Sequence, residues 1–448
     1  MISTALVLSM SSRPPKTIRK LAVLFAVATH LAAIIAGGYF LSPEFTVYPF
    51  LVSRGFLPYV NIIDQHFPAL LFGPISLPSF LTTNPQPLLA LFLLVTAATD
   101  LFFFFSLLRR RVASPEIWLI IWVVMSYWFS GNTFWLETFI SLFLAVILFL
   151  GQSRRPLVTF AAGFLFGLIA LTKPTLFPAL VLLFLFLKLP LNPFFLAGLL
   201  SPVFVTGLYL LKFDLLPSFL YLTLDFNRRF YALLAAKALT LRQLVETSLF
   251  FIPSLLLFIK KKQPLSFATI LLSLILVYPR FESVHLQPAL LLTLFCLAPM
   301  IVLKKRLLLP AAALVLAFAI AKNYRHHYGN FYLDAETIKL AEDLRAKPET
   351  SLYVFGGSDL LYPLTNRIPP GFTYLPSLPW YWRDASLSQK MVTALSDSFT
   401  TTVVVRNKAF LDGANIQASA GLIGEFIKEN YRLIGTIGSY QIYQRVLK

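Results

Sequence analysis

The chain has 448 residues, of which 57% are hydrophobic and only 13% are charged. Its mean hydropathy of +0.74 excludes an ordinary soluble globular protein and indicates a polytopic α-helical membrane protein. The formal net charge is +18, but the basic residues stand in short clusters between apolar runs, so the charge does not indicate a nucleic-acid-binding protein.

Apolar runs of about the ~20 residues that a membrane helix needs recur along the first 322 residues and predict about eleven spans. They lie at 20–40, 87–108, 115–130, 134–151, 157–171, 174–191, 193–211, 245–259, 265–279, 287–303 and 307–322. Every second connection between them is basic, which places the N-terminus in the cytoplasm and, with an odd number of spans, the C-terminus outside. The expected location is therefore the cell membrane, with the first run kept as a signal anchor.

Residues 41–86 form the first outer loop of this prediction. Glu44, Arg54, Asp64 and His66 would be costly in hydrocarbon. Any helix long enough to cross would be interrupted by prolines, among them Pro43, Pro49, Pro58, Pro68 and Pro74. The segment is nevertheless apolar and aromatic, so we expect it to lie on the membrane surface. Short amphipathic helices are expected at 46–53 and 68–80.

From residue 323 the composition changes, and residues 323–448 are expected to form a small α/β domain outside the membrane, after a transmembrane domain of residues 1–322. DAETIKLAEDLRA and AGLIGEFIKENY have helical periodicity. SLYVFGG and TTTVVVRN are typical of strands, and YRLIGTIGSYQIYQRV is typical of a hairpin.

Two acids of the first outer loop are candidate catalytic residues. Glu44 follows the first apolar run, and Asp64 stands in YVNIIDQHFP. A carboxylate that loses water at the membrane boundary has a raised pKa and can act as a general base. The alternative for either residue is a helix cap or a solvated loop charge.

Four cations on the same face are candidate ligands of a donor phosphate: Lys173, Arg228, Arg229 and Arg280. Basic residues are disfavoured on the outer face, and arginine binds phosphate oxygens in bidentate fashion. The alternative is that these side chains reach toward lipid headgroups.

No cofactor is expected from the sequence. His66 and His285 are possible metal ligands, but the chain has no HxxxH, no CxxC and no acidic triplet, so a divalent metal is unsupported. Asp100, deep in the second apolar run, is expected to pair with another group inside the helix bundle. Cys296, the single cysteine, is expected to be a small buried side chain.

Four motifs in chain order resemble the GT-C class of membrane glycosyltransferases, the bacterial relatives of dolichyl-phosphate-mannose protein mannosyltransferases and of aminoarabinose transferases. RGFLPYVNIIDQHFPALL resembles the G-x-x-x-Y-x-D-x-x-x-x-x-P pattern of the first outer loop, which includes Tyr59. GNTFWLETF, with Glu137, resembles the segment that opens a later span. LTKPT resembles the K-x-T turn, and RFESVHLQPALLL resembles the stretch before a late span.

The resemblance implies a polyprenyl-phosphate sugar donor, inversion at the anomeric carbon, and an acid of the first outer loop near the acceptor. The residues predicted to bind donor phosphate or acceptor are Lys173, Arg228, Arg229, Arg280, His285, Glu137, Tyr59 and His66. The chain departs from the class after the first span, where Pro43–Glu44 stands in place of an Asp-Glu pair. Either Glu44 or Asp64 then takes the acid's role, or the chain has lost activity.

The sequence thus favours a glycosyltransferase of the hexosyltransferase type that acts in the cell envelope, at the extracytoplasmic face of the cell membrane. Its partners would be a polyprenyl-phosphate-linked sugar, a lipid, glycan or protein acceptor, and membrane lipids, with no nucleic acid. The alternatives are a transporter or lipid flippase, which would need ionisable residues at mid-membrane, and an inactive GT-C-like scaffold.

Overall fold

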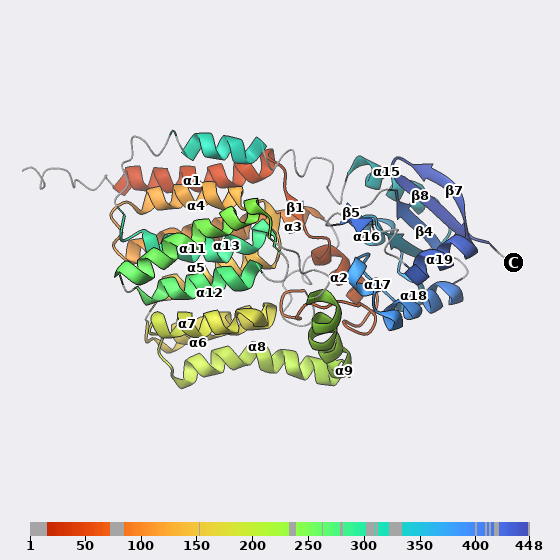
Figure 1. The fold of residues 1–448 in the computed structure, drawn as a ribbon, viewed down its shortest axis with the longest axis horizontal. Coiled ribbons are helices and arrows are strands. Elements are labelled where there is room, and N and C mark those ends of the chain that lie inside the picture. Colours follow the sequence, from red (N-terminus) through yellow and green to blue (C-terminus); the bar gives the residue numbers. More distant parts are fainter. Residues whose placement is uncertain are drawn as a thin grey trace, which may run out of the picture.

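The computed structural model describes residues 16–71, 85–151, 153–232, 239–261, 263–277, 281–301, 310, 312–321, 334–398, 401–407, 410–411, 414–415 and 421–446. Figure 1 shows a bundle of roughly parallel and antiparallel helices on one side and a sheet with its helices on the other. The segment after the first helix lies between these two parts.

Apolar helices occur at each position where the sequence predicts a span. They are α1 Lys16–Ala36, α3 Pro85–Arg109, α4 Pro115–Trp128, α5 Leu136–Leu150, α6 Pro156–Thr172, α7 Phe177–Phe186, α8 Pro193–Lys212, α11 Leu241–Lys261, α12 Pro264–Val277, α13 Gln287–Leu297 and the helix Ala312–Ala321. Among the described residues, four of these helices are long and apolar enough to cross a membrane, namely those containing 19–36, 87–109, 193–212 and 241–261. The total of eleven crossings therefore stays a prediction.

Prolines and glycines explain how several of these helices begin and pack. Proline stands in the first turn of α4, α6, α7 and α8, where its missing N–H costs nothing. Gly163 of α6 and Gly198 of α8 face the other helix so closely that an added Cβ would overlap a backbone carbonyl. Small residues that allow helix backbones to touch are the usual basis of packing between membrane helices.

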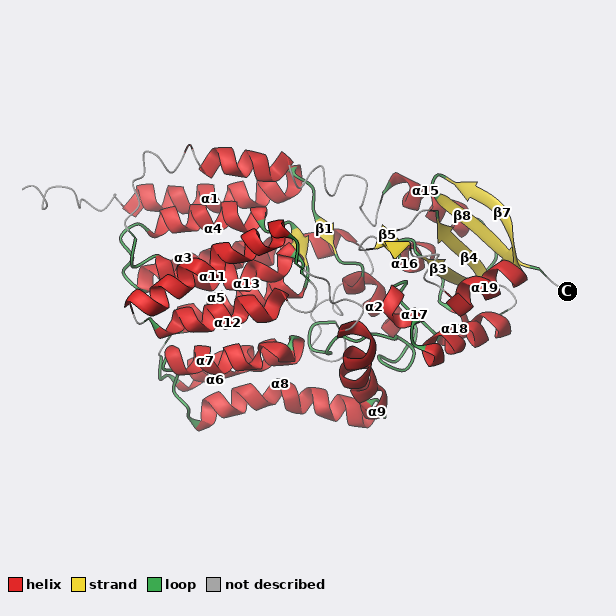
Figure 2. Cartoon of the chain, viewed as in Figure 1, coloured by secondary structure: helices red, strands yellow, loops and turns green. Residues whose placement is uncertain are grey.

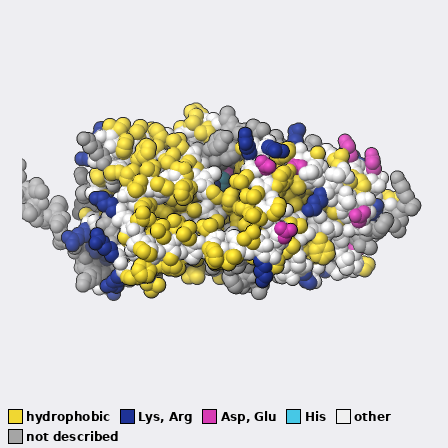
Figure 3. All heavy atoms as spheres, turned by 90° about the horizontal axis from the view of Figure 1, so that it is seen from below, with side chains coloured by type: hydrophobic (Ala, Val, Ile, Leu, Met, Phe, Trp, Pro, Cys, Tyr) yellow, Lys and Arg dark blue, Asp and Glu magenta, His cyan; other side chains and the backbone are white. Residues whose placement is uncertain are grey.

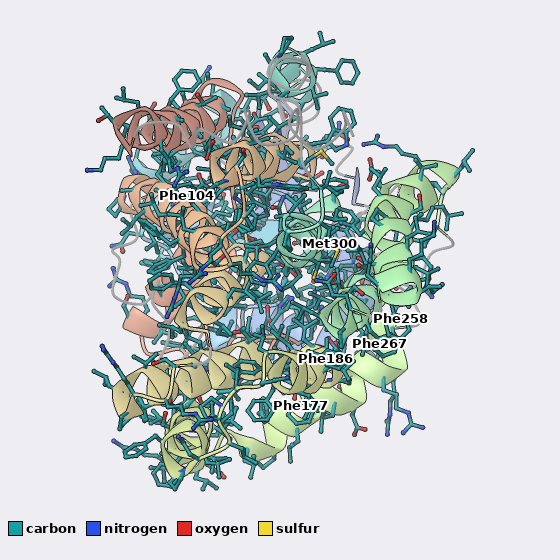
Figure 4. The ribbon with its side chains drawn as sticks, turned by 90° about the vertical axis from the view of Figure 1, so that its left-hand side faces the viewer. Phe104, Phe177, Phe186, Phe258, Phe267 and Met300 are labelled. Carbon is teal, nitrogen blue, oxygen red and sulfur yellow. The ribbon has the colours of Figure 1, made fainter. Side chains whose placement is uncertain are left out.

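The outer surface of the bundle is apolar. Phe204, Leu208 and Leu211 of α8 are 65%, 50% and 63% exposed. Figure 3 shows hydrophobic side chains spread over this part, with Lys and Arg at the end away from the sheet. Figure 4 views the bundle from that end, where Phe258 of α11 and Phe267 of α12 pack with ring centroids 5.3 Å apart. The surface fits a multi-pass membrane protein, whereas the orientation of its ends stays a prediction.

The structure confirms what the sequence predicts for Asp100 and Cys296, two residues inside the bundle. Both carboxylate oxygens of Asp100 contact His30 Nδ1, at 3.1 and 3.0 Å, and Trp122 Nε1 donates to Oδ1 at 2.7 Å. The pairing expected for Asp100 is therefore present. Cys296 is a buried free cysteine, as expected.

The elements expected after residue 323 are also found, within a mixed four-stranded sheet of order β3-β4-β8-β7 (Figure 2). The strands are β3 Ser351–Phe355, β4 Thr401–Arg406, β7 Tyr431–Ile437 and β8 Tyr440–Arg445, and β5 Phe410–Leu411 pairs with β6 Ala414–Asn415. The helices are α15 Ala335–Arg345, α16 Leu361–Thr365, α17 Pro379–Trp382, α18 Ala385–Asp397 and α19 Gly421–Asn430. β3 and β4 are parallel, and the other two pairings are antiparallel.

The first outer loop differs from the expected surface segment. Helix α2 spans Glu44–Ser53, as predicted for 46–53, but residues Phe45–Leu51 are all buried, so the helix has no polar face. Its apolar sequence explains this, because a helix that is hydrophobic all round needs cover on every side. Residues 68–71 form a turn, and the rest of the second expected helix, 72–80, lies outside the described residues.

The loop is covered by residues more than 300 positions away in the chain. The Ile63 N–H donates to the Tyr374 carbonyl at 3.0 Å, and the Tyr374 N–H donates to the Asn61 carbonyl at 2.8 Å. Phe56 stacks on Phe372 with ring centroids 4.9 Å apart. The C-terminal residues therefore hold the loop against the end of the bundle.

Candidate active site

Glu44 is the first residue of α2 and accepts a hydrogen bond from the Ser42 hydroxyl. Its position is set by β1 Phe40–Leu41, which pairs in parallel with β2 Thr133–Phe134 and so ties the end of α1 to the start of α5. Burial raises the pKa of the Glu44 carboxyl above its ordinary value, and the Asp64 charge adds to this, whereas the Ser42 hydrogen bond lowers it. Glu44 is thus a half-buried acid that holds its proton more tightly than usual.

Asp64 is 2% exposed and accepts several hydrogen bonds. The Tyr48 hydroxyl donates to Oδ2, while the His66 backbone N–H donates to Oδ1 at 2.6 Å. His66 Nδ1 lies 2.7 Å from the same oxygen. Burial lowers the pKa of His66, but the charge and hydrogen bond of Asp64, with a contribution from Glu44, leave it raised.

Tyr59 supports this turn of the loop from behind. Its hydroxyl donates to the His66 carbonyl at 3.0 Å, and its ring packs edge-on against Phe219. Its φ of 65° lies in the left-handed region, which is unusual for an aromatic residue. Strained backbone of this kind collects at functional sites, where the surrounding structure holds it in place.

Glu137, Lys173 and His285 form a second charged group at the ends of α5, α6 and α13. Lys173 Nζ lies 2.6 Å from Glu137 Oε1, and His285 Nε2 lies 3.8 Å from the same oxygen. His285 is also 3.8 Å from Glu282. The sequence motifs placed Glu137, Lys173 and His285 on one face, but they did not predict that the three side chains touch.

Trp135, which directly precedes α5, packs against the first outer loop. Its ring packs edge-on against His66 with centroids 5.4 Å apart, and it is 5.7 Å from the ring of Phe45, the neighbour of Glu44. The charge of Lys173 also acts on His66, where it partly opposes the rise in the pKa of the imidazole that Asp64 causes. The two groups therefore belong to one electrostatic environment.

Two of the three candidate arginines, Arg228 and Arg229, lie outside this cluster. Arg228 and Arg229 are exposed on the π-helix η4, Tyr221–Tyr231, and Arg229 is 3.9 Å from Asp225. Arg280 lies outside the described residues. Helix η4 nevertheless adjoins the loop, because Asn227 Nδ2 donates to the Gln65 carbonyl at 3.1 Å.

Asp359 is an acid that the sequence analysis did not single out. It follows β3, accepts a hydrogen bond from the Tyr374 hydroxyl at 2.8 Å, and interacts electrostatically with Glu44. Burial, opposed by the Tyr374 hydrogen bond and assisted by the Glu44 charge, raises the pKa of Asp359 to about 7. Its only sequence signal was its place after a strand and a Gly-Gly pair, which many βα turns share.

The buried carboxyl of Asp64, two half-buried carboxyls and one histidine thus meet where the loop, the bundle and the C-terminal residues join. Acids with raised pKa values and a carboxylate-paired imidazole can accept and hold protons near neutral pH. Among the described residues, no group of three or more His, Cys, Asp or Glu side chains is arranged to hold a metal ion.

Comparisons with known proteins find a similar structure but no related sequence. No protein-family model and no curated protein sequence matches the chain. Among solved structures, it is similar to the archaeal oligosaccharyltransferase AglB from Archaeoglobus fulgidus, which was solved in complex with an inhibitory peptide and a dolichol-phosphate. The TM-score is 0.51 at 12% sequence identity, over 96% of this chain and 74% of that chain. The chain therefore shares its overall fold with this oligosaccharyltransferase.

Proposed function

We propose that the protein is an integral membrane glycosyltransferase that moves a sugar from a polyprenyl-phosphate donor to an acceptor outside the cytoplasm. The observation that carries the proposal is the meeting of Glu44, Asp64 and His66 in one partly buried cluster at the end of the bundle. The similarity in fold to an oligosaccharyltransferase supports it, because that protein was solved with a lipid phosphate of the dolichol type.

In this proposal Glu44 is the general base. Asp64 already accepts hydrogen bonds from the Tyr48 hydroxyl and from two atoms of His66, so its lone pairs are committed to positioning the loop. Glu44 accepts a hydrogen bond from Ser42, and its raised pKa makes it a better proton acceptor at neutral pH than an exposed glutamate.

The reaction would be an in-line displacement. An acceptor hydroxyl attacks the anomeric carbon, its proton passes to Glu44, and the bond from the anomeric carbon to the phosphate oxygen breaks with inversion. The polyprenyl phosphate leaves with the bonding electron pair. Lys173 and His66, whose pKa is raised, provide positive charge near the acids, and Arg228, Arg229 and Arg280 would add to it from the same face.

The test is transfer by purified protein in nanodiscs, with a panel of polyprenyl-phosphate sugars as donors. Glu44→Gln keeps the size of the side chain and removes the base, so turnover is expected to fall by about 10²–10⁴-fold while donor binding persists. Asp225→Asn is the matched control, because this 55% exposed carboxylate lies on the same face outside the cluster.

Wild-type turnover in Glu44→Gln would remove Glu44 from the mechanism. If no donor of the panel is used and the wild-type protein instead moves labelled lipid across the bilayer, the protein is a flippase. If the wild-type protein binds donor but neither transfers sugar nor moves lipid, it is an inactive scaffold.

A further inference from the structure

Inside the bundle, a small polar cavity adjoins the Asp100 cluster. Its volume is about 20 Å³, and its walls come from α1, α3, α4, α5, α13 and the β2 turn. His30, Asp100, Trp122, Ser126, Ser141 and Gln287 are among its lining residues. A cavity needs ~10–15 Å³ to hold one water molecule, so this one has room for a water.

Most polar atoms around the cavity already have partners. His30 Nδ1 and Trp122 Nε1 contact the Asp100 carboxylate, and Gln287 Nε2 donates to the Ser126 and Phe129 carbonyls at 2.7 Å each. The Ser126 hydroxyl donates to Gln287 Oε1 at 3.0 Å.

Two buried polar atoms remain. Within the described part of the chain, His30 Nε2 and Ser141 Oγ make no hydrogen bond, although the two residues are only 1% and 3% exposed. Both residues line the same cavity. A buried polar atom without a hydrogen-bond partner destabilises the folded protein. A small ligand that forms a hydrogen bond with each of the two atoms is therefore expected in the cavity.

We propose that this cavity binds an ordered water molecule that bridges His30 Nε2 and Ser141 Oγ. Water can donate to a neutral imidazole nitrogen or accept from a charged one, and it can do either with a hydroxyl. A metal ion fits less well, because both oxygens of Asp100 are already hydrogen-bonded to ring nitrogens.

The bound water would complete a polar connection across the apolar bundle. Asp100 joins α1 to α3 and α4, and the water joins α1 to α5 through Ser141. The cavity also adjoins Thr133 of β2, which pairs with β1 just before Ser42. The water therefore lies beside the strand pair that sets the position of the first outer loop.

Radiolytic hydroxyl labelling of the wild-type protein in nanodiscs tests the site, because radicals form from bound water and oxidise the side chains next to it. Trp122 and Trp118 lie on the same helix and are 2% and 4% exposed, but only Trp122 is among the lining residues. Trp122 is expected to be oxidised several-fold faster than Trp118. Equal rates would overturn the proposal.

A substitution then locates the water. Ser141→Val removes one partner and fills space, so the oxidation rate of Trp122 is expected to fall to that of Trp118. Ser273→Val is the matched control, since Ser273 is buried on α12 and its hydroxyl donates to the Thr269 carbonyl of its own helix at 2.8 Å. Unchanged labelling of Trp122 in Ser141→Val would refute the bridge.

If Ser141→Val does not fold, a density map of the wild-type protein at a resolution that shows waters decides the question. A peak within hydrogen-bonding distance of both His30 Nε2 and Ser141 Oγ supports the proposal. A dry cavity overturns it.

Discussion

The pair formed by Lys173 and Glu137 gives a sharp prediction, because its two members are unequally buried. The side chain of Glu137 is 1% exposed, whereas that of Lys173 is 23% exposed. Lys173→Met leaves a carboxylate that cannot reach water, and breaking a buried pair from this side costs about 3–5 kcal/mol. Glu137→Gln leaves a lysine whose flexible chain can turn toward solvent, so the expected cost is about 1 kcal/mol or less.

The free energy of unfolding of each variant can be measured by detergent-driven unfolding in bicelles. The double variant is expected to recover most of the loss of Lys173→Met, since it removes the buried charge together with its partner. Lys212→Met is the control, because Lys212 is exposed at the end of α8, and its effect is expected to stay within about 0.5 kcal/mol. The reasoning fails if Glu137→Gln is the more damaging change, or if Lys173→Met is as stable as the wild type.

Three further predictions concern packing, pH dependence and topology. Gly163→Ala is expected to lower the midpoint of thermal unfolding, because the new Cβ would overlap a backbone carbonyl of α8. Gly207→Ala is the control and is expected to be neutral or stabilising, because nothing lies within 4 Å of the new Cβ. Equal midpoints for the two variants would contradict the close packing of α6 and α8. If Glu44 is the base, the acid limb of kcat/KM against pH lies above 4.5, the ordinary pKa of glutamate, since burial raises this pKa. Ser42→Ala removes a hydrogen bond that favours the ionised form, so it should move that limb to still higher pH, and a shift to lower pH would exclude this role. A reporter enzyme fused at Arg155 is expected to be active only inside the cell and one fused after the last strand only outside, and the reverse result would invert the topology.

Local pattern in the sequence was enough to place most elements. The apolar runs predict the helices of the bundle because a membrane helix is recognised by its own composition, without knowledge of its neighbours. Separate helices at 177–186 and 193–212 agree with the two runs that prolines interrupt. The strands and the hairpin after residue 323 follow from alternation and from Gly438, whose φ of 56° suits the turn.

The acids of the first outer loop could be named from the sequence, but their surroundings could not. The expected surface loop is buried, because Asn61 and Ile63 pair with Tyr374, and no periodicity relates residues so far apart in the chain. The partnership of Lys173 with Glu137 and the approach of Asp359 to Glu44 depend on contacts of the same long range.

The reason for this division is physical. Helix formation and membrane insertion depend on neighbours within a few turns, so composition and spacing predict them. The protonation state of a carboxyl depends instead on which distant side chains remove water from it or place charge beside it. The sequence alone named Glu44, Asp64 and His66 as candidate residues, and the tertiary structure decided that they lie together in one partly buried cluster at the end of the bundle.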